Sequence, residues 1–115
     1  MDLDIKESGA VCVLKLKGRL VSGDAVNQFE NAFQRALSEG HIFLVLDLEA
    51  LAYIDSSGIG SIVNALRQVN KLGGSVKLVN PASFVAKTLK MVGILTLFEV
   101  FESEADALAA CGVPG

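Results

Sequence analysis

The sequence Ile42-Phe43-Leu44-Val45-Leu46-Asp47-Leu48 forms an almost unbroken apolar run. A strand with one face in water alternates apolar and polar residues, whereas a strand with helices over both faces is apolar throughout. The run is also far shorter than the roughly 20 residues that a membrane-spanning helix needs. We therefore predict that it is the central strand of a largely parallel sheet in an α/β protein.

Amphipathic helices are predicted before and after this strand. From Asp24 to Gly40, apolar residues recur every three or four positions, which is the period of one helix face: Val26, Phe29, Phe33, Ala36 and Leu37. A second stripe of this kind follows the strand and stops at Gly73-Gly74: Ile59, Ile62, Val63, Leu66 and Val69. Strands that alternate with helices favour right-handed crossovers and parallel pairing.

The rest of the chain continues this alternation. Residues 11–18 form a half-exposed strand that we expect to pair with residues 3–6 across a Ser8-Gly9 turn. Further elements are expected downstream: a strand at 75–79, a helix from Pro81 to about Met91, a strand at 97–101, and a last helix to Gly112 after the capping box Ser103-Glu104-Ala105-Asp106. The predicted order is β-β-α-β-α-β-α-β-α. It describes one α/β domain over residues 1–115, with its core at about 3–110 and a mostly parallel mixed sheet that has an antiparallel edge hairpin.

Composition narrows the classes of function. The 115 residues include 10 Lys and Arg against 13 Asp and Glu, a net charge of −3, so no basic surface for direct nucleic-acid binding is expected. The N-terminus lacks the pattern of a secretory signal, and we expect a cytoplasmic protein with no membrane insertion. Cys12 and Cys111 are interpreted as reduced thiols, and the one histidine, His41, as a loop residue with no ligand role. With so few nucleophiles and bases, we expect no catalytic residue, metal or cofactor, and therefore a protein that is not an enzyme.

The segment Asp55-Ser56-Ser57-Gly58-Ile59-Gly60 lies between the central strand and the second predicted helix. Ligand and partner sites gather at the carboxyl ends of strands in open α/β sheets, and a helix start offers free N–H groups. One interpretation is structural: Asp55 or Ser56 caps the helix and the glycines serve packing. A dinucleotide fingerprint does not fit, because Val63 stands where a third small residue is needed, and a hydrolase elbow fails at Ile54. A further interpretation is that Ser56 is itself the substrate of a modifying enzyme.

The chain resembles the STAS-domain family, specifically the bacterial anti-sigma factor antagonists. The resemblance runs from about Leu3 to Ala110, and its motifs are Gly18-Arg19-Leu20, Leu46-Asp47-Leu48, Asp55-Ser56-Ser57-Gly58-Ile59-Gly60 and Gly73-Gly74-Ser75-Val76-Lys77-Leu78-Val79. It implies a STAS-like domain whose motif serine, here Ser56, is phosphorylated by an anti-sigma factor serine kinase and dephosphorylated by a serine phosphatase. The unphosphorylated form would bind the anti-sigma factor and release a sigma factor.

The resemblance also implies a docking surface and leaves alternatives open. The surface would comprise Asp55, Ser57, Gly58, Ile59 and Gly60, and we add Asp24, which is also expected to cap the first helix. One departure is Val21, which stands where many such antagonists have an acidic residue. The oligomeric state could be a monomer or a weak dimer. Alternative functions are an accessory subunit of a membrane transport system of the lipid-transport type, and a nucleotide-binding STAS module.

Overall fold

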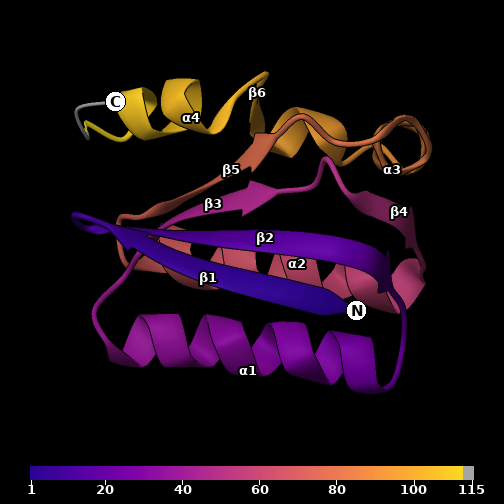
Figure 1. Cartoon of the computed structure of the whole chain (residues 1–115), viewed down its shortest axis with the longest axis horizontal. Coiled ribbons are helices and arrows are strands. Elements are labelled where there is room, and N and C mark those ends of the chain that lie inside the picture. The colour runs from indigo at the N-terminus through magenta and orange to yellow at the C-terminus, as the bar shows by residue number, and fades with distance from the viewer. Residues whose placement is uncertain (113–115) are drawn as a thin grey trace.

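The computed structural model describes residues 1–112 and has the predicted α/β architecture (Figure 1). Its elements, in chain order, are β1 (Asp2–Ser8), β2 (Val11–Leu20), α1 (Asp24–Ser38), β3 (Phe43–Asp47), β4 (Leu51–Ile54), α2 (Ser56–Lys71), β5 (Ser75–Val79), α3 (Ser83–Met91), the short 3₁₀-helix η1 (Leu95–Leu97), β6 (Glu99–Phe101) and α4 (Glu104–Ala110). The sheet has the order β1-β2-β3-β5-β6, in which only the β1–β2 pair is antiparallel. The predicted fold class and its edge hairpin are therefore confirmed.

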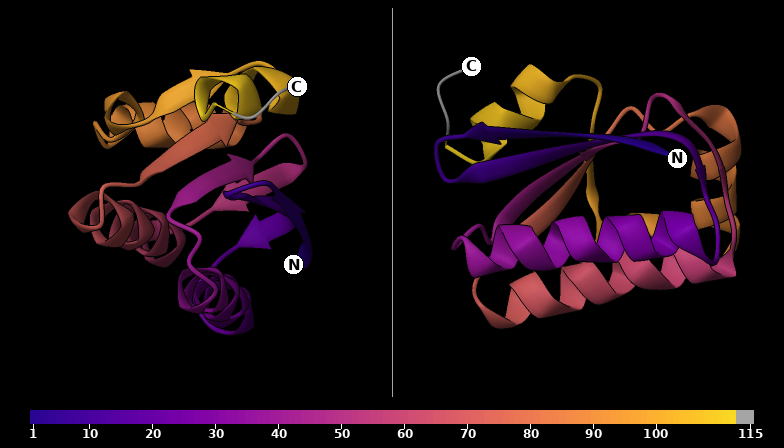
Figure 2. Two further views of the ribbon diagram at one scale, coloured as in Figure 1. Left: turned by 90° about the vertical axis from the view of Figure 1, so that its left-hand side faces the viewer. Right: turned by 60° about the horizontal axis from the view of Figure 1, so that its bottom comes forward.

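Strand β3 is central, as its composition predicts. Leu44 and Leu46 are fully buried on the face that α1 and α2 cover, and Val45 is fully buried on the opposite face, against Ala107 and Leu108 of α4. Figure 2 shows α1 and α2 side by side beneath the sheet, with α4 on the other side. Burial on both faces explains why this strand has no polar alternation.

Strand β4 is an element that the sequence analysis did not predict. Leu51 and Ile54 are buried and the two residues between them are exposed, a pattern of period three that does not indicate a strand. β4 pairs in parallel with the last residues of β2, beyond a register shift at Gly18 and Arg19. Gly18 has a φ of +100°, which residues with a side chain rarely adopt. This irregularity lets β2 pair first with β3 and then with β4.

A side-chain cap marks the start of the last helix, α4. Ser103 caps α4, its side chain accepting a hydrogen bond from the Asp106 N–H at 3.1 Å, which is one of the two bonds of the predicted capping box. Both cysteines are free thiols, Cys12 buried and Cys111 half-buried.

Among residues 1–112, no helix combines the length and apolar character that crossing a membrane would require.

Candidate functional site

The segment 55–60 lies where the carboxyl ends of β2 and β4 meet the start of α2. Leu20 pairs with Ile54, and the next N–H, that of Asp55, donates to the Leu20 carbonyl at 3.2 Å. The chain then enters the 16-residue helix α2 at Ser56. The predicted placement at a helix N-terminus is what the structure shows, but the segment follows β4 rather than the central strand β3 that the sequence indicates.

Asp55 is the N-cap of α2 and also binds a second loop. Its Oδ1 accepts the Gly58 N–H at 2.8 Å, and its Oδ2 accepts the Ser22 N–H at 2.9 Å. These donors, Ser22 first and Gly58 second, hold the pKa of the Asp55 carboxyl below its usual range. The carboxylate therefore joins the β2–α1 loop to the start of α2, and it is a poor proton acceptor because its charged form is already stabilised.

Ser56 and Ser57 are the first two residues of α2, and both are exposed. Of the two residues that the sequence offers as caps, Asp55 occupies the cap position, which leaves Ser56 as the first and exposed residue of the helix. The helix dipole and the N–H groups of the first turn favour an anion at such a position. An exposed hydroxyl at the positive end of a long helix is chemically suited to accept a phosphoryl group.

The two glycines of the motif have different surroundings. Gly58 is buried, and a methyl group there would overlap the Leu20 carbonyl oxygen and lie 2.8 Å from Ile54 Cγ1. Gly60 is exposed, and a methyl group there would have no atom within 4 Å. Between them Ile59 is partly buried and packs against the main core. Gly58 therefore allows close packing of α2 on β2, whereas Gly60 keeps an exposed part of the first helical turns free of a side chain.

The structure corrects the predicted role of Asp24 as a helix cap. Gly23 is the N-cap of α1, with a φ of +101°, and Asp24 is the first helical residue. A carboxylate there still interacts favourably with the helix dipole. The Asp24 region is nevertheless tied to the candidate site, because Ser22, two residues earlier, donates its N–H to Asp55.

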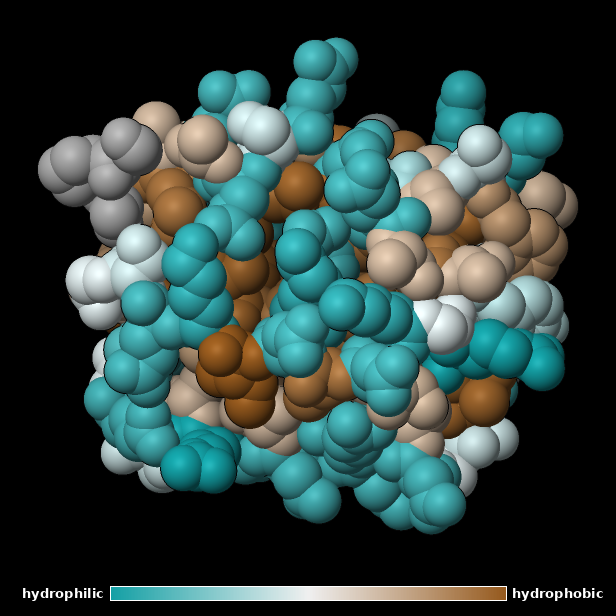
Figure 3. All heavy atoms as spheres, in the orientation of Figure 1, coloured by the Kyte–Doolittle hydropathy of each residue, from teal (hydrophilic) through white to brown (hydrophobic). Residues whose placement is uncertain are grey.

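Three side chains beside the motif were not predicted as site residues. The Arg19 guanidinium lies 4.8 Å from the centre of the Tyr53 ring, and Tyr53 stacks on Phe84 of α3 with ring centres 5.1 Å apart. All three are exposed, Phe84 by 49%. Figure 3 shows apolar surface over the α3 region. Nothing in the sequence indicates this stack, because Tyr53 lies on the unpredicted strand β4 and Phe84 is about 30 residues away in the chain.

Comparisons with known proteins agree with this architecture. The STAS domain family model matches residues 2–107. The anti-sigma F factor antagonist of Paenibacillus polymyxa is 30% identical over 111 residues, which cover 94% of this chain and 92% of that protein. The anti-sigma factor antagonist SpoIIAA in its unphosphorylated form superposes with a TM-score of 0.84 at 23% identity, over 99% of this chain and 100% of that one. The Bacillus cell fate determinant SpoIIAA in the phosphorylated form gives 0.78 at 22% identity, over 96% and 99%.

Proposed function

The chain belongs to the STAS domain family, and its relatives are anti-sigma factor antagonists, so we propose that it is a binding protein switched by phosphorylation of Ser56. In this proposal an anti-sigma factor serine kinase modifies Ser56 and a serine phosphatase reverses the modification. Unphosphorylated protein binds the anti-sigma factor and thereby releases a sigma factor. The observation that carries the proposal is the exposed Ser56 hydroxyl at the start of α2, directly after the fixed Asp55 carboxylate.

Local charge explains how such a switch would work without refolding. A phosphate on Ser56 adds about two negative charges. The fold accommodates them, because they lie at the positive end of the α2 dipole. A partner that docks here must remove water from this phosphate and from the adjacent Asp55 carboxylate, and the paired like charges raise that cost. Phosphorylation therefore weakens docking while leaving the domain folded.

The proposed docking surface has a polar part and an apolar part. The polar part is the start of α2, with Asp55, Ser57 and Gly60, and the start of α1 with Asp24. Gly58 is buried and Ile59 is half-buried against the core, so these two predicted residues shape the surface from beneath. The apolar part is the exposed stack of Arg19, Tyr53 and Phe84. This stack lies next to the motif, because Tyr53 is two residues before Asp55. Aromatic and arginine side chains are enriched where interfaces gain most of their affinity. In this function the chain is the substrate of another enzyme and needs no catalytic group of its own.

The test uses the purified protein, an anti-sigma factor serine kinase from the same genome, and ATP. We expect mass spectrometry to find one phosphate, on Ser56. Ser57→Ala is the matched control, because it removes the neighbouring exposed hydroxyl and should still be phosphorylated, whereas Ser56→Ala should not. In a binding assay with the kinase, Ser56→Asp should weaken affinity by about tenfold or more, equivalent to about 1.4 kcal/mol. Phosphate on another residue, or equal binding of Ser56→Asp and Ser56→Ala, would contradict the proposal.

A further inference from the structure

A second cluster of polar side chains lies at the other end of β2. Glu7 is near the end of β1, Glu39 follows α1, and His41 lies in the loop that leads into β3. One ligand atom from each lies within 4.8 Å of the others. Glu39 and His41 are two residues apart, and Glu7 comes from a separate segment, near the end of β1. The cluster is built from residues that the proposed docking surface does not use.

The His41 ring is oriented as a ligand would be. Its side chain is only 12% exposed, and its Nδ1 lies 3.3 Å from the Ala10 carbonyl oxygen. A carbonyl oxygen can only accept, so Nδ1 carries the proton and, in neutral imidazole, Nε2 presents its lone pair. Nε2 lies 3.3 Å from Glu7 Oε1. Histidines that bind metals usually donate their other ring N–H to a backbone carbonyl or a carboxylate in this way.

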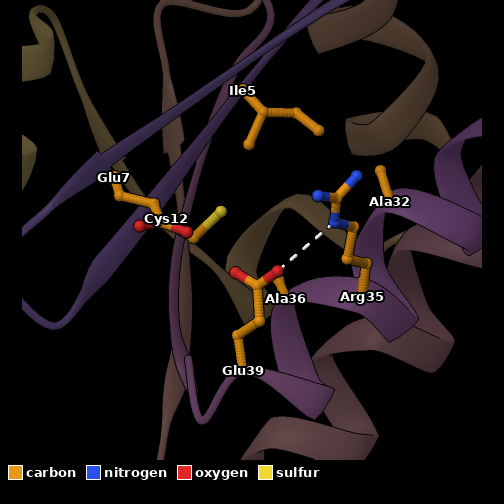
Figure 4. A pocket seen from close by; sticks show the side chains of 7 residues that line it. All are labelled: Ile5, Glu7, Cys12, Ala32, Arg35, Ala36 and Glu39. Carbon is orange, nitrogen blue, oxygen red and sulfur yellow. Dashed lines mark hydrogen bonds and ion pairs between the residues drawn. The ribbon is translucent and has the colours of Figure 1, made fainter.

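The cluster also borders an open space. A cavity of about 200 Å³ is lined by Glu7, Glu39, Arg35 and the buried Cys12, among others (Figure 4). Arg35 Nε lies 3.3 Å from Glu39 Oε1 and offsets part of the charge of the two carboxylates. The second Glu39 oxygen is outside this ion pair. The cavity gives access to water, which a metal ion with only three protein ligands needs in order to complete its coordination.

We propose that Glu7, Glu39 and His41 form a binding site for Zn²⁺. Two ligand atoms about 2.0 to 2.1 Å from a tetrahedral zinc lie about 3.3 to 3.4 Å apart, which matches the distance between His41 Nε2 and Glu7 Oε1. One imidazole and two carboxylates suit zinc, whereas Mg²⁺ and Ca²⁺ prefer oxygen ligands throughout. A water molecule from the cavity takes the remaining position. The proposal departs from the expectations, drawn from the sequence, that His41 has no ligand role and that the protein binds no metal.

Bound zinc would join two parts of the domain. Glu7 belongs to the edge strand β1, which pairs with β2 alone, and Glu39 and His41 flank the turn from α1 to β3. An ion held by all three residues links the edge strand to the helix layer. Because the ion binds the folded state, it should raise the unfolding temperature in proportion to the logarithm of its concentration.

The test is a zinc titration of the metal-free full-length chain by calorimetry, with Mg²⁺ in excess to remove weak oxygen sites. We expect one Zn²⁺ per chain. The chain has a single histidine, so the imidazole ¹⁵N signals report on His41 alone. Zinc should move the Nε2 signal and leave Nδ1 protonated. Absence of saturable binding, or binding with an unchanged His41 spectrum, would overturn the site.

Matched variants distinguish a specific zinc site from nonspecific binding of zinc to acidic side chains. Glu39→Gln and His41→Gln should each weaken zinc binding by about tenfold or more. Glu30→Gln removes the same charge from an exposed position of α1 and should leave the affinity unchanged. Arg35→Gln frees Glu39 from its ion pair and should tighten binding several-fold. Circular dichroism confirms that each variant is folded, and equal zinc affinity in all four variants would contradict the proposal.

Discussion

The two ends of strand β2 support sites of different construction. At the carboxyl end, residues 55–60 are contiguous, and one carboxylate, that of Asp55, holds them in place through backbone N–H groups. At the amino end, Glu7 of β1 meets Glu39 and His41 of the α1–β3 connection through their side chains. A contiguous site fixed by the backbone leaves a motif in the sequence and depends on close packing. A site assembled by side chains from two segments leaves at most a short local signal, here Glu39-Gly40-His41.

The largest expected effect tests the close packing at the carboxyl end. Gly58→Ala places a methyl group against the Leu20 carbonyl oxygen and Ile54 Cγ1. The overlap can be relieved only if α2 moves away from β2. We expect a loss of about 2 to 3 kcal/mol in the free energy of unfolding. Urea denaturation followed by circular dichroism measures it.

Gly60→Ala is the control for this change, since it adds the same atom two residues later in open space. Helix propensity predicts a gain in stability of up to about 1 kcal/mol. If Gly60 belongs to the docking surface, the variant should bind the proposed partner, an anti-sigma factor kinase, more weakly although it is more stable. Equal destabilisation by both substitutions would show that the motif has no special packing at Gly58.

Much of the fold could be predicted because its signals are local and physical. The apolar run of β3 follows from burial on both faces, and the α1 and α2 stripes follow from burial on one face. Strand β4 could not be predicted, because its four residues show no alternation and its pairing with β2 depends on the irregularity at Gly18. This strand forms because it pairs with β2, and not because of a pattern in its own sequence.

The candidate site, like the fold, could be predicted only where its signals are local. A cap at Asp55 or Ser56 follows from local residue types and could be predicted, and the structure identifies Asp55 as the cap. The bond from Ser22 to Asp55, and the stack of Tyr53 on Phe84, join positions about 30 residues apart in the chain, and such contacts have no local signal. The Asp24 cap was wrong because Gly23 adopts a positive φ that lets the helix begin without a side-chain cap.

A smaller effect is expected from the Asp55 carboxylate, and it depends on pH. Because backbone N–H groups lower its pKa in the folded state, its contribution to stability is complete above the usual aspartate pKa of about 3.9. It is lost as the pH falls through the lower native value. Asp55→Asn should therefore have a lower urea midpoint than the parent at neutral pH, and this difference should shrink toward zero in acid.

Asp24→Asn is the control for the pH experiment. It removes a carboxylate from the first turn of α1, where the cap position is a glycine. Only the interaction with the helix dipole is lost, so its midpoint should fall less than that of Asp55→Asn. A difference between parent and Asp55→Asn that stays constant down to the lowest pH at which both fold would argue against the carboxylate bridge.

The smallest expected effect is that of a charge at Ser56 on zinc binding, and it tests whether the two ends of β2 act separately. They are connected by a ten-residue strand, or about 33 Å of extended chain, and screening at physiological salt acts over about 8 Å. A negative charge at Ser56 should therefore not reach Glu7, Glu39 or His41, and Ser56→Asp should bind Zn²⁺ with the parent affinity within a factor of two. Conversely, zinc should not alter phosphorylation of Ser56 in the parent chain. A zinc affinity that changes with Ser56→Asp would require coupling through β2 itself, because direct charge interaction is too weak at this separation.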